Sequence, residues 1–193
     1  YAAEPIGVYV GTGADVSAYE QLGVFIPDSD IYENITVDLT AYAGETISVA
    51  FRHFDITDMF SVKIDQVEVF VTAGGDEPDP TPTPSPDPEP SPDPEPSPEP
   101  GDALFGEFFE EDPTVDWTFV DADGDGNNWI WDYDSIFESY EGVGHIRSES
   151  YINYVGAVTP DNWAISPEMT IPANAVDATL SFYFAAQDPD YAA

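Results

Sequence analysis

Residues 59–71 read MFSVKIDQVEVFV, and this stretch decides the fold class. Valine, isoleucine and phenylalanine alternate with polar residues along it, and a period of two is typical of a β-strand. Strict alternation predicts two faces, which are Lys63, Asp65 and Val67 on one side and Ile64, Gln66 and Glu68 on the other. The stretch therefore predicts a strand with one face directed into a core.

Segments of the same character lie throughout the chain. Each is rich in valine, isoleucine, aromatic residues or threonine and is bounded by turn-forming residues. They are IGVYVGT (6–12), ENITVDL (33–39), ETISVAFRHF (45–54), DWTFVD (116–121), NNWIWDY (127–133), SYINYVG (150–156), NWAIS (162–166) and ATLSFYFAAQ (178–187). Residues 14–23 are expected to form one or two helical turns at most. Many short strands predict an all-β chain folded as a sandwich of antiparallel sheets.

A proline-rich segment at residues 76–100 divides the chain. Proline occupies every even position from Pro78 to Pro100, and the residues between are Asp, Glu, Ser and Thr. This pattern favours an extended polyproline II or disordered spacer that builds no core. Residues 1–75 and 101–193 are then two flanking parts, and we expect them to pack together as one sandwich.

The chain begins and ends with the same tripeptide, YAA. When the two copies are overlapped, the sequence reads LSFYFAAQDPDYAAEPIGVYVGT, which is two strand-like segments joined by a turn. We interpret the chain as one period of a tandem array that opens inside a domain. In that order, residues 101–193 form the first half of a domain and residues 1–75 the second half, which makes the chain a circular permutant.

The charge is extreme. The net charge is −36, and Arg52, Lys63 and Arg147 are the three basic residues. Such a chain repels the phosphates of nucleic acids and anionic lipids, so we exclude nucleic acid and electrostatic membrane binding. No apolar run reaches membrane-spanning length, and the absence of cysteine excludes disulfides and sulfur-ligated metals. So many carboxylates fit either bound calcium or a saline habitat.

The loop DADGDG at residues 121–126 has metal-binding spacing. Asp121, Asp123 and Asp125 match the first ligand positions of an EF-hand calcium loop, Gly126 matches its glycine, and Asn127 and Asp132 stand at positions seven and twelve. Strand-like segments flank the loop where an EF-hand has helices. We therefore predict a calcium site in a β-loop that stabilises the fold, and the alternative is an acidic turn without an ion. Further candidate ligands, drawn from distant segments, are Glu110, Glu111, Asp188, Asp65 and Glu4.

Four motifs carry a resemblance to a known family. They are DWTFVDADGDGNNW (116–129), SESYINYVGAVTPDNWAISPEMTIP (148–172), the overlapped strand pair through AAQDPDYAAEPIGVYVGTG, and TVDLTAYAGETISVAFRHFDITDMFSVKIDQVEV (36–69). Together they resemble the cleaved adhesin domains of gingipain-type surface proteins, also met as choice-of-anchor β-domains. Two positions depart from the family pattern: Gln66 replaces the second Asp of an IDDV motif, and Pro5–Ile6 interrupts an E-x-Y motif. Both departures count against any metal role that the family gives these positions.

The resemblance implies a galactose-binding-like jelly-roll sandwich that is non-catalytic, extracellular and stabilised by calcium. The residues support the expectation that the domain is non-catalytic. His53 and His145 are the only histidines, and no GxSxG elbow or HExxH motif accompanies them. The carboxylates are too numerous for any pair to indicate glycoside hydrolysis.

The expected function is an adhesion or binding module, repeated on a secreted or cell-surface bacterial protein. Its partners would be a host or cell-surface protein or a glycan, besides other copies of the repeat. Two alternatives remain, which are an accessory carbohydrate-binding domain of a secreted hydrolase and a purely structural stalk. For sugar binding, Trp129, Trp131 and Trp163 are candidate stacking residues, although large aromatic residues also fill sandwich cores.

Overall fold

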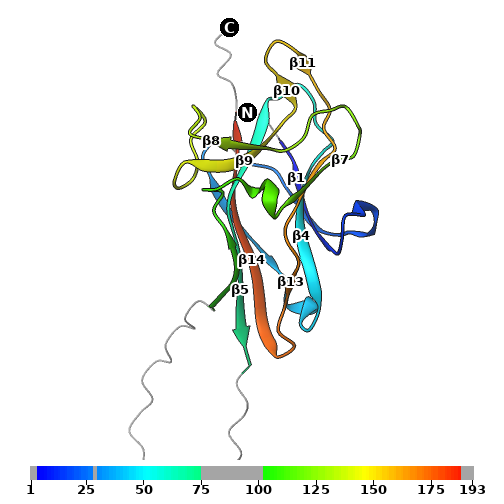
Figure 1. Ribbon diagram of the computed structural model, residues 1–193, viewed down its shortest axis with the longest axis vertical. Helices are drawn as coiled ribbons and strands as arrows, with labels where there is room; N and C mark the ends of the chain where they lie inside the picture. Colours follow the sequence, from blue (N-terminus) through cyan, green and yellow to red (C-terminus); the bar gives the residue numbers. More distant parts are fainter. Residues whose placement is uncertain (1–3, 28–29, 75–101, 188–193) are drawn as a thin grey trace, which may run out of the picture.

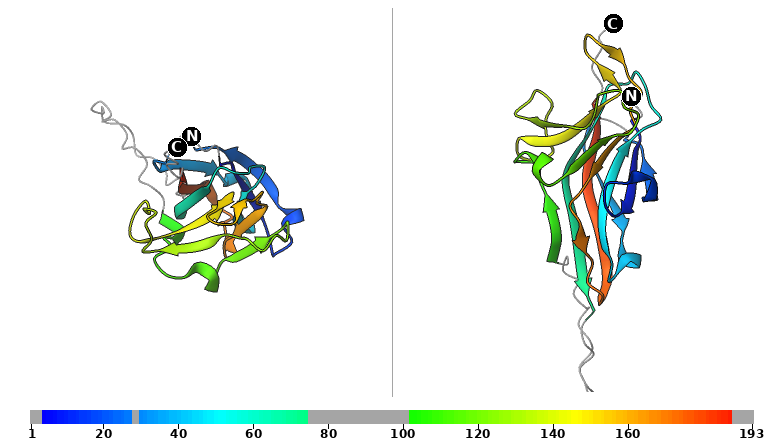
Figure 2. Two further views of the ribbon diagram at one scale, coloured as in Figure 1. Left: turned by 90° about the horizontal axis from the view of Figure 1, so that it is seen from above. Right: turned by 45° about the vertical axis from the view of Figure 1, so that its right-hand side comes forward.

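The computed structural model describes residues 4–27, 30–74 and 102–187 of the 193-residue chain. The proline-rich segment 76–100 and the candidate ligand Asp188 lie outside the described residues. The described parts form an elongated sandwich of two β-sheets, which face each other in the view from above (Figures 1 and 2). The predicted all-β class and antiparallel sheets are confirmed. No helix in the described part is long and apolar enough to span a membrane.

The first sheet has the strand order β2-β1-β4-β12-β7, and β13 adds to β4. Its strands are β1 (Ile6–Gly11), β2 (Glu20–Phe25), β4 (Thr46–His53), β7 (Thr118–Asp121), β12 (Asn162–Ile165) and β13 (Met169–Thr170). Every pairing in it is antiparallel. Strands from both sides of the proline-rich segment therefore belong to one sheet, joined where β4 pairs with β12 and β13.

The second sheet has the order β3-β14-β5-β9-β8, and β6 adds to β5. Its strands are β3 (Glu33–Asp38), β5 (Ser61–Ala73), β6 (Asp102–Glu107), β8 (Ile130–Tyr133), β9 (Gly144–Glu149) and β14 (Ala175–Gln187). A separate hairpin of β10 (Tyr151–Ile152) and β11 (Gly156–Ala157) projects from one end, at the top of Figure 1.

Three short 3₁₀ turns complete the structure: η1 (Val16–Ala18), η2 (Thr40–Tyr42) and η3 (Pro113–Val115). η1 is the turn expected within residues 14–23, and strand β2 follows it directly. Asp15 caps η1, because its carboxylate accepts the Ser17 backbone N–H at 3.1 Å. The turn remains a single one because Tyr19, which follows it, has an extended backbone (φ −76°, ψ 134°).

The core lies between the two sheets and is largely aromatic. Phe51 of β4 and Phe182 of β14, one from each sheet, meet edge to face with ring centroids 4.9 Å apart. Trp117 stacks on Phe51 at 6.3 Å and is itself buried. Aromatic pairs of this kind bury large apolar areas. The sheets are therefore joined by side chains from both flanking parts of the chain.

A β-bulge at Gln66 changes the face pattern of β5. Gln66 has φ of 47°, and the register with β14 shifts between Ser181 and Tyr183. Ile64 enters the core before the bulge and Val67 after it. The strict alternation expected for residues 63–68 is thus wrong, because one extra residue on the bulged strand reverses the faces beyond it.

Candidate functional site

The acidic loop follows directly from β7, and its backbone folds around Asp121. The Asp121 carboxylate accepts the backbone N–H of Gly124 at 2.7 Å and of Gly126 at 2.9 Å. Both glycines have positive φ, 73° and 88°. Glycine adopts this left-handed conformation without a steric penalty. The Asp-Gly-Asp-Gly sequence therefore specifies a tight turn that brings its carboxylates to one side.

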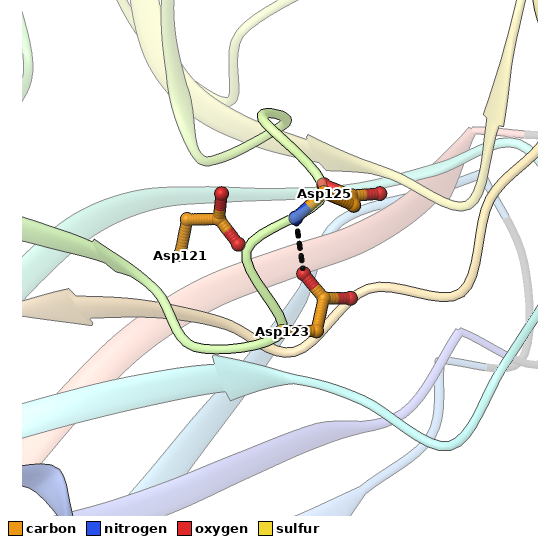
Figure 3. Close-up of side chains that lie close together, drawn as sticks. All are labelled: Asp121, Asp123 and Asp125. Carbon is orange, nitrogen blue, oxygen red and sulfur yellow. Dashed lines mark hydrogen bonds between the residues drawn. The ribbon is translucent and has the colours of Figure 1, made fainter.

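The other two aspartates complete a cluster (Figure 3). One carboxylate oxygen from each of Asp121, Asp123 and Asp125 lies within 4.8 Å of the others. Asp123 accepts the Asp125 N–H at 3.2 Å, and Asp125 accepts both the backbone N–H and the side-chain amide of Asn127 at 2.7 and 2.8 Å. The predicted residue Asn127 therefore supports the cluster through Asp125.

The cluster carries unbalanced negative charge. The backbone N–H of Gly126 lowers the pKa of Asp121. Partial burial and the neighbouring Asp121 carboxyl raise the pKa of Asp123. None of the described salt bridges involves these three aspartates. An oxygen-only donor set at this spacing fits a hard cation such as calcium, which takes carboxylate and carbonyl oxygens.

Asp132, the expected twelfth-position ligand, is not part of the cluster. It lies on β8, where Arg147 Nε donates to its Oδ2 at 2.9 Å. His145 Nε2 lies 3.7 Å from the same oxygen. Burial lowers the pKa of His145 to about 4, so this imidazole is neutral near pH 7. The EF-hand spacing fails here because an extended strand carries the residue away from the loop.

Glu4 is fully buried, and its carboxylate is engaged within the chain. Oε1 accepts the Phe60 backbone N–H at 2.9 Å and the Ser150 hydroxyl at 2.8 Å, and Oε2 lies 2.7 Å from His53 Nε2. His53 Nδ1 lies 2.9 Å from the Ser148 hydroxyl oxygen. Glu4 is not in the aspartate cluster, and it joins the segment before β5 to the end of β9.

Asp65 and Glu110 hold the loop at residues 134–143. Asp65 Oδ2 accepts the backbone N–H of Tyr140 at 2.9 Å and of Glu141 at 3.2 Å, and Oδ1 accepts that of Gln66 at 2.8 Å. Burial raises the pKa of Asp65 to about 6. Glu110 accepts the Val143 N–H at 3.0 Å. Neither acid is in the aspartate cluster, and both act on one loop.

The candidate sugar-stacking tryptophans are packed inside the fold. Trp129 and Trp163 are 3% and 4% exposed, and Trp131 is partly buried against the core. Trp129 Nε1 donates to the Asn162 carbonyl at 3.0 Å, and Trp131 Nε1 to the Phe109 carbonyl at 2.7 Å. Buried indole groups normally find such a partner. These side chains stabilise the sandwich and offer no exposed platform.

Sequence reasoning missed two features. One is the buried carboxylate–imidazole–hydroxyl chain of Glu4, His53 and Ser148, whose members are far apart in the sequence. The other is a cavity of about 520 Å³ beside the loop at 134–143, with Lys63 and Tyr140 in its lining. No spacing pattern signals either one, because the carboxylate–imidazole–hydroxyl chain draws on three separate segments and the cavity on four.

The fold and loop define a class, an antiparallel β-sandwich module with an acidic surface loop and no exposed catalytic constellation among its described residues. The family described as Cleaved Adhesin Domain matches residues 12–69 and 103–193. The chain therefore belongs to the cleaved adhesin domain family. The match covers both sides of the proline-rich segment.

Similar proteins come from Porphyromonas gingivalis. Two sequences of Hemagglutinin A are 28% and 38% identical to this chain, over 94% and 93% of its length and 11% and 9% of their own. A Lys-gingipain is 37% identical over 46% of this chain and 5% of its own length. The chain thus spans about a tenth of the length of the hemagglutinin relatives. No solved structure matches it.

Proposed function

We propose that this chain is a non-catalytic, extracellular adhesion module that binds a host or cell-surface ligand. The observation that carries the proposal is the family match over both flanking parts, which together supply every strand of the two sheets. The relatives named Hemagglutinin A support a role in contact with cells. In this proposal the chain is one binding unit, and repetition of such units would raise avidity.

The projecting β10–β11 hairpin supports a contact role. At its tip, Tyr154 is fully exposed and Val155 is 73% exposed. Tyr154 has φ of 68°, a left-handed conformation that a bulky residue rarely adopts. Exposed apolar residues at a projecting tip are suited to contact with a partner, and strained backbone is a recurring feature of binding sites. The hairpin stands at the end of the sandwich opposite the start of β14 (Figure 1).

The non-catalytic part of the proposal rests on burial. Ser148, His53 and Glu4 form a hydroxyl–imidazole–carboxylate chain that superficially resembles a hydrolase triad. All three residues have 0% exposure. A substrate therefore cannot reach the hydroxyl without the sandwich opening, and these distances are explained by satisfied polar groups in an interior.

The adhesion proposal is tested with beads carrying the full chain and a suspension of erythrocytes. We expect the coated beads to bind cells, and Tyr154→Ser to weaken binding by about tenfold, since exposed aromatic anchors dominate many interfaces. Val176→Ser is the matched control, because Val176 is 62% exposed at the far end of the sandwich. Cell binding no greater than that of uncoated beads would overturn the proposal.

We also propose that calcium occupies the aspartate cluster and stabilises the module. The support is the 4.8 Å grouping of three carboxylates with no balancing cation among the described residues. A bound ion would cross-link the end of β7 to the loop that leads into β8, and Ala122 N–H already ties this loop to the Asp161 carbonyl at 2.9 Å. The ion would thereby fix the connection between the two sheets.

Thermal melting in calcium and in chelator tests the metal proposal. At a calcium concentration of about 100 times Kd, we expect the folded state to gain about 2.7 kcal/mol. Asp123→Asn should remove most of the shift, and Asp116→Asn, an exposed acid outside the cluster, should retain it. An equal melting temperature in calcium and chelator would show that the loop holds no stabilising ion.

A further inference from the structure

The cavity of about 520 Å³ is open to solvent and lies on the outer side of the second sheet. It lies over β5, between residues 30–32 and the loop at 134–143. Its lining combines one base, two acids, a hydroxyl, an amide, two tyrosine rings and two isoleucines; these residues are Asp30, Ile31, Tyr32, Lys63, Ile136, Glu138, Ser139, Tyr140 and Gln187. Mixed aromatic and polar linings of this size are typical of small-ligand sites.

Lys63 forms the basic part of the lining and is fixed in place. Its ammonium donates to the Glu138 carbonyl at 3.0 Å and lies 4.8 Å from the centre of the Tyr32 ring. No carboxylate of the described residues lies within salt-bridge distance of it, whereas Arg52 and Arg147 both have such partners. An ammonium has three donors. Lys63 is only 3% exposed. A ligand group would therefore reach it from within the cavity, and no ion pair with a described residue would have to break.

Tyr140 supplies a fixed aromatic surface. Its ring stacks on Tyr183 with centroids 3.6 Å apart and planes inclined by 16°, and Tyr32 meets it edge to face at 5.8 Å. The backbone N–H of Tyr140 is held by the buried Asp65 carboxylate. The ring is nevertheless 42% exposed. An aromatic ring that is both held and exposed is pre-organised for contact, and pre-organisation reduces the entropy lost on binding.

The charges restrict the class of ligand. An anion would meet Asp30 and Glu138 at the cavity and a net charge of −36 on the chain. A cation would meet Lys63. A neutral ligand with several hydroxyl groups escapes both penalties, because each hydroxyl can accept from Lys63 and donate to a carboxylate. Its apolar ring face would pack on Tyr140.

We propose that this cavity binds a neutral saccharide, with Tyr140 as the stacking residue and Lys63, Asp30 and Glu138 as hydrogen-bonding residues. The inference rests on the proposed adhesion function and names a ligand class for it. Of the candidate tryptophans, Trp129 and Trp163 are buried and Trp131 is partly buried, so the proposal gives the stacking role to the exposed Tyr140.

The test uses the full ¹⁵N-labelled chain and four neutral disaccharides, lactose, maltose, cellobiose and N,N′-diacetylchitobiose. We expect at least one of them to shift the amide resonances of Ser139 and Tyr140 in a saturable way. Tyr140→Ala should then weaken binding about threefold to tenfold, whereas Tyr140→Phe keeps the ring and should retain most of it. Tyr133→Ala is the matched control, since Tyr133 is 50% exposed and outside the cavity lining.

Two results would overturn the proposal. One is that none of the four disaccharides shifts these resonances at high millimolar concentration. The other is that Tyr140→Ala, folded as judged by an unchanged melting transition, binds as tightly as the unmodified chain. If the coated beads still bind erythrocytes in either case, the saccharide inference fails and the adhesion function stands. If the beads bind no cells, the adhesion function itself fails.

Discussion

The buried and the exposed carboxylates of this chain are held in opposite ways. Glu4 and Asp65 are both at 0% exposure, and each accepts hydrogen bonds from parts of the chain distant in sequence. Asp121, Asp123 and Asp125 lie at the surface and accept from their own loop alone. The buried acids therefore join segments, whereas the exposed acids shape one turn and leave their negative charge unbalanced.

This difference separates structural acids from candidate ligand acids in a chain with 39 of them. A buried carboxylate must be fully hydrogen-bonded, since leaving it unpaired is costly. An exposed cluster persists at little cost because water screens it. The number and spacing of acids in the sequence do not distinguish the two kinds. They are distinguished in the structure by whether the N–H groups that bond each carboxylate come from distant segments or from its own loop.

Removal of Glu4 should have the largest effect. Glu4→Ala removes the buried partner of the Ser150 hydroxyl and of His53, and it leaves the Phe60 N–H with the Ser150 hydroxyl oxygen as its acceptor. We expect the free energy of unfolding to fall by about 3–5 kcal/mol. Urea denaturation measures the loss. Glu45→Ala, at an exposed acid, should stay within about 0.5 kcal/mol of the unmodified chain; similar losses in both variants would contradict the assignment.

Asp65→Asn should destabilise the chain by about 1–3 kcal/mol, because an amide nitrogen in place of either oxygen faces a backbone N–H. The loss should appear as faster hydrogen exchange at Tyr140 and Glu141. Asp134→Asn, in the same loop but exposed, is the control. Unchanged exchange at these two amides in Asp65→Asn would show that the carboxylate does not hold the loop.

The pH dependence of stability distinguishes two buried groups. The pKa of Asp65 is raised from 3.8 to about 6, so its contribution is present below pH 3.8 and is lost as pH rises through 6. The pKa of His145 is lowered from 6.5 to about 4, so its contribution is present above pH 6.5 and is lost as pH falls toward 4. Between pH 4 and 6 the two groups therefore change the free energy of unfolding in opposite directions as pH rises.

Urea unfolding of calcium-free protein across this range separates the two contributions. In His145→Gln the pH dependence that comes from Asp65 should remain, so the free energy of unfolding should fall as pH rises. In Asp65→Asn the pH dependence that comes from His145 should remain, so the free energy of unfolding should rise as pH rises. Parallel profiles for the two variants would contradict the directions given for these pKa values.

Neutralising one exposed aspartate should have the smallest effect. In chelator, Asp123→Asn removes repulsion from Asp121 and Asp125, and we expect a gain of a few tenths of a kcal/mol. In calcium, the same variant should be less stable than the unmodified chain. Paired denaturation curves in the two solutions check the reversal. A loss of stability in chelator would place Asp123 with the buried, structural acids.

Much of the fold was predictable from the sequence because strand periodicity is local. The β-branched and aromatic segments around Phe51 and Phe182 became strands, and the DADGDG loop formed the expected cluster. The bulge at Gln66 was not predictable, because a single strand's sequence does not show where its partner skips a residue. The cavity proposed for saccharide was not predictable either. Lys63 and Tyr140 both line it because Asp65 holds the loop that carries Tyr140.

Two positions show where sequence spacing stops being informative. EF-hand spacing, which applies to a loop between helices, predicts Asp132 as a ligand, and the structure places it on strand β8 with Arg147 as its partner. Gln66 departs from the family pattern, and in the structure it is the left-handed residue of the bulge. Spacing transfers between folds only when the backbone between the positions has the same shape.

The pairing of β5 with β6 has a consequence for how such a module changes over time. Val71 lies opposite Asp102, so the end of β5 and the start of β6, which are consecutive strands, lie side by side. For a flexible connection between two such ends, doubling its length adds only about 0.6 kcal/mol of closure entropy. A change in the number of residues between β5 and β6 should therefore cost the sandwich little stability.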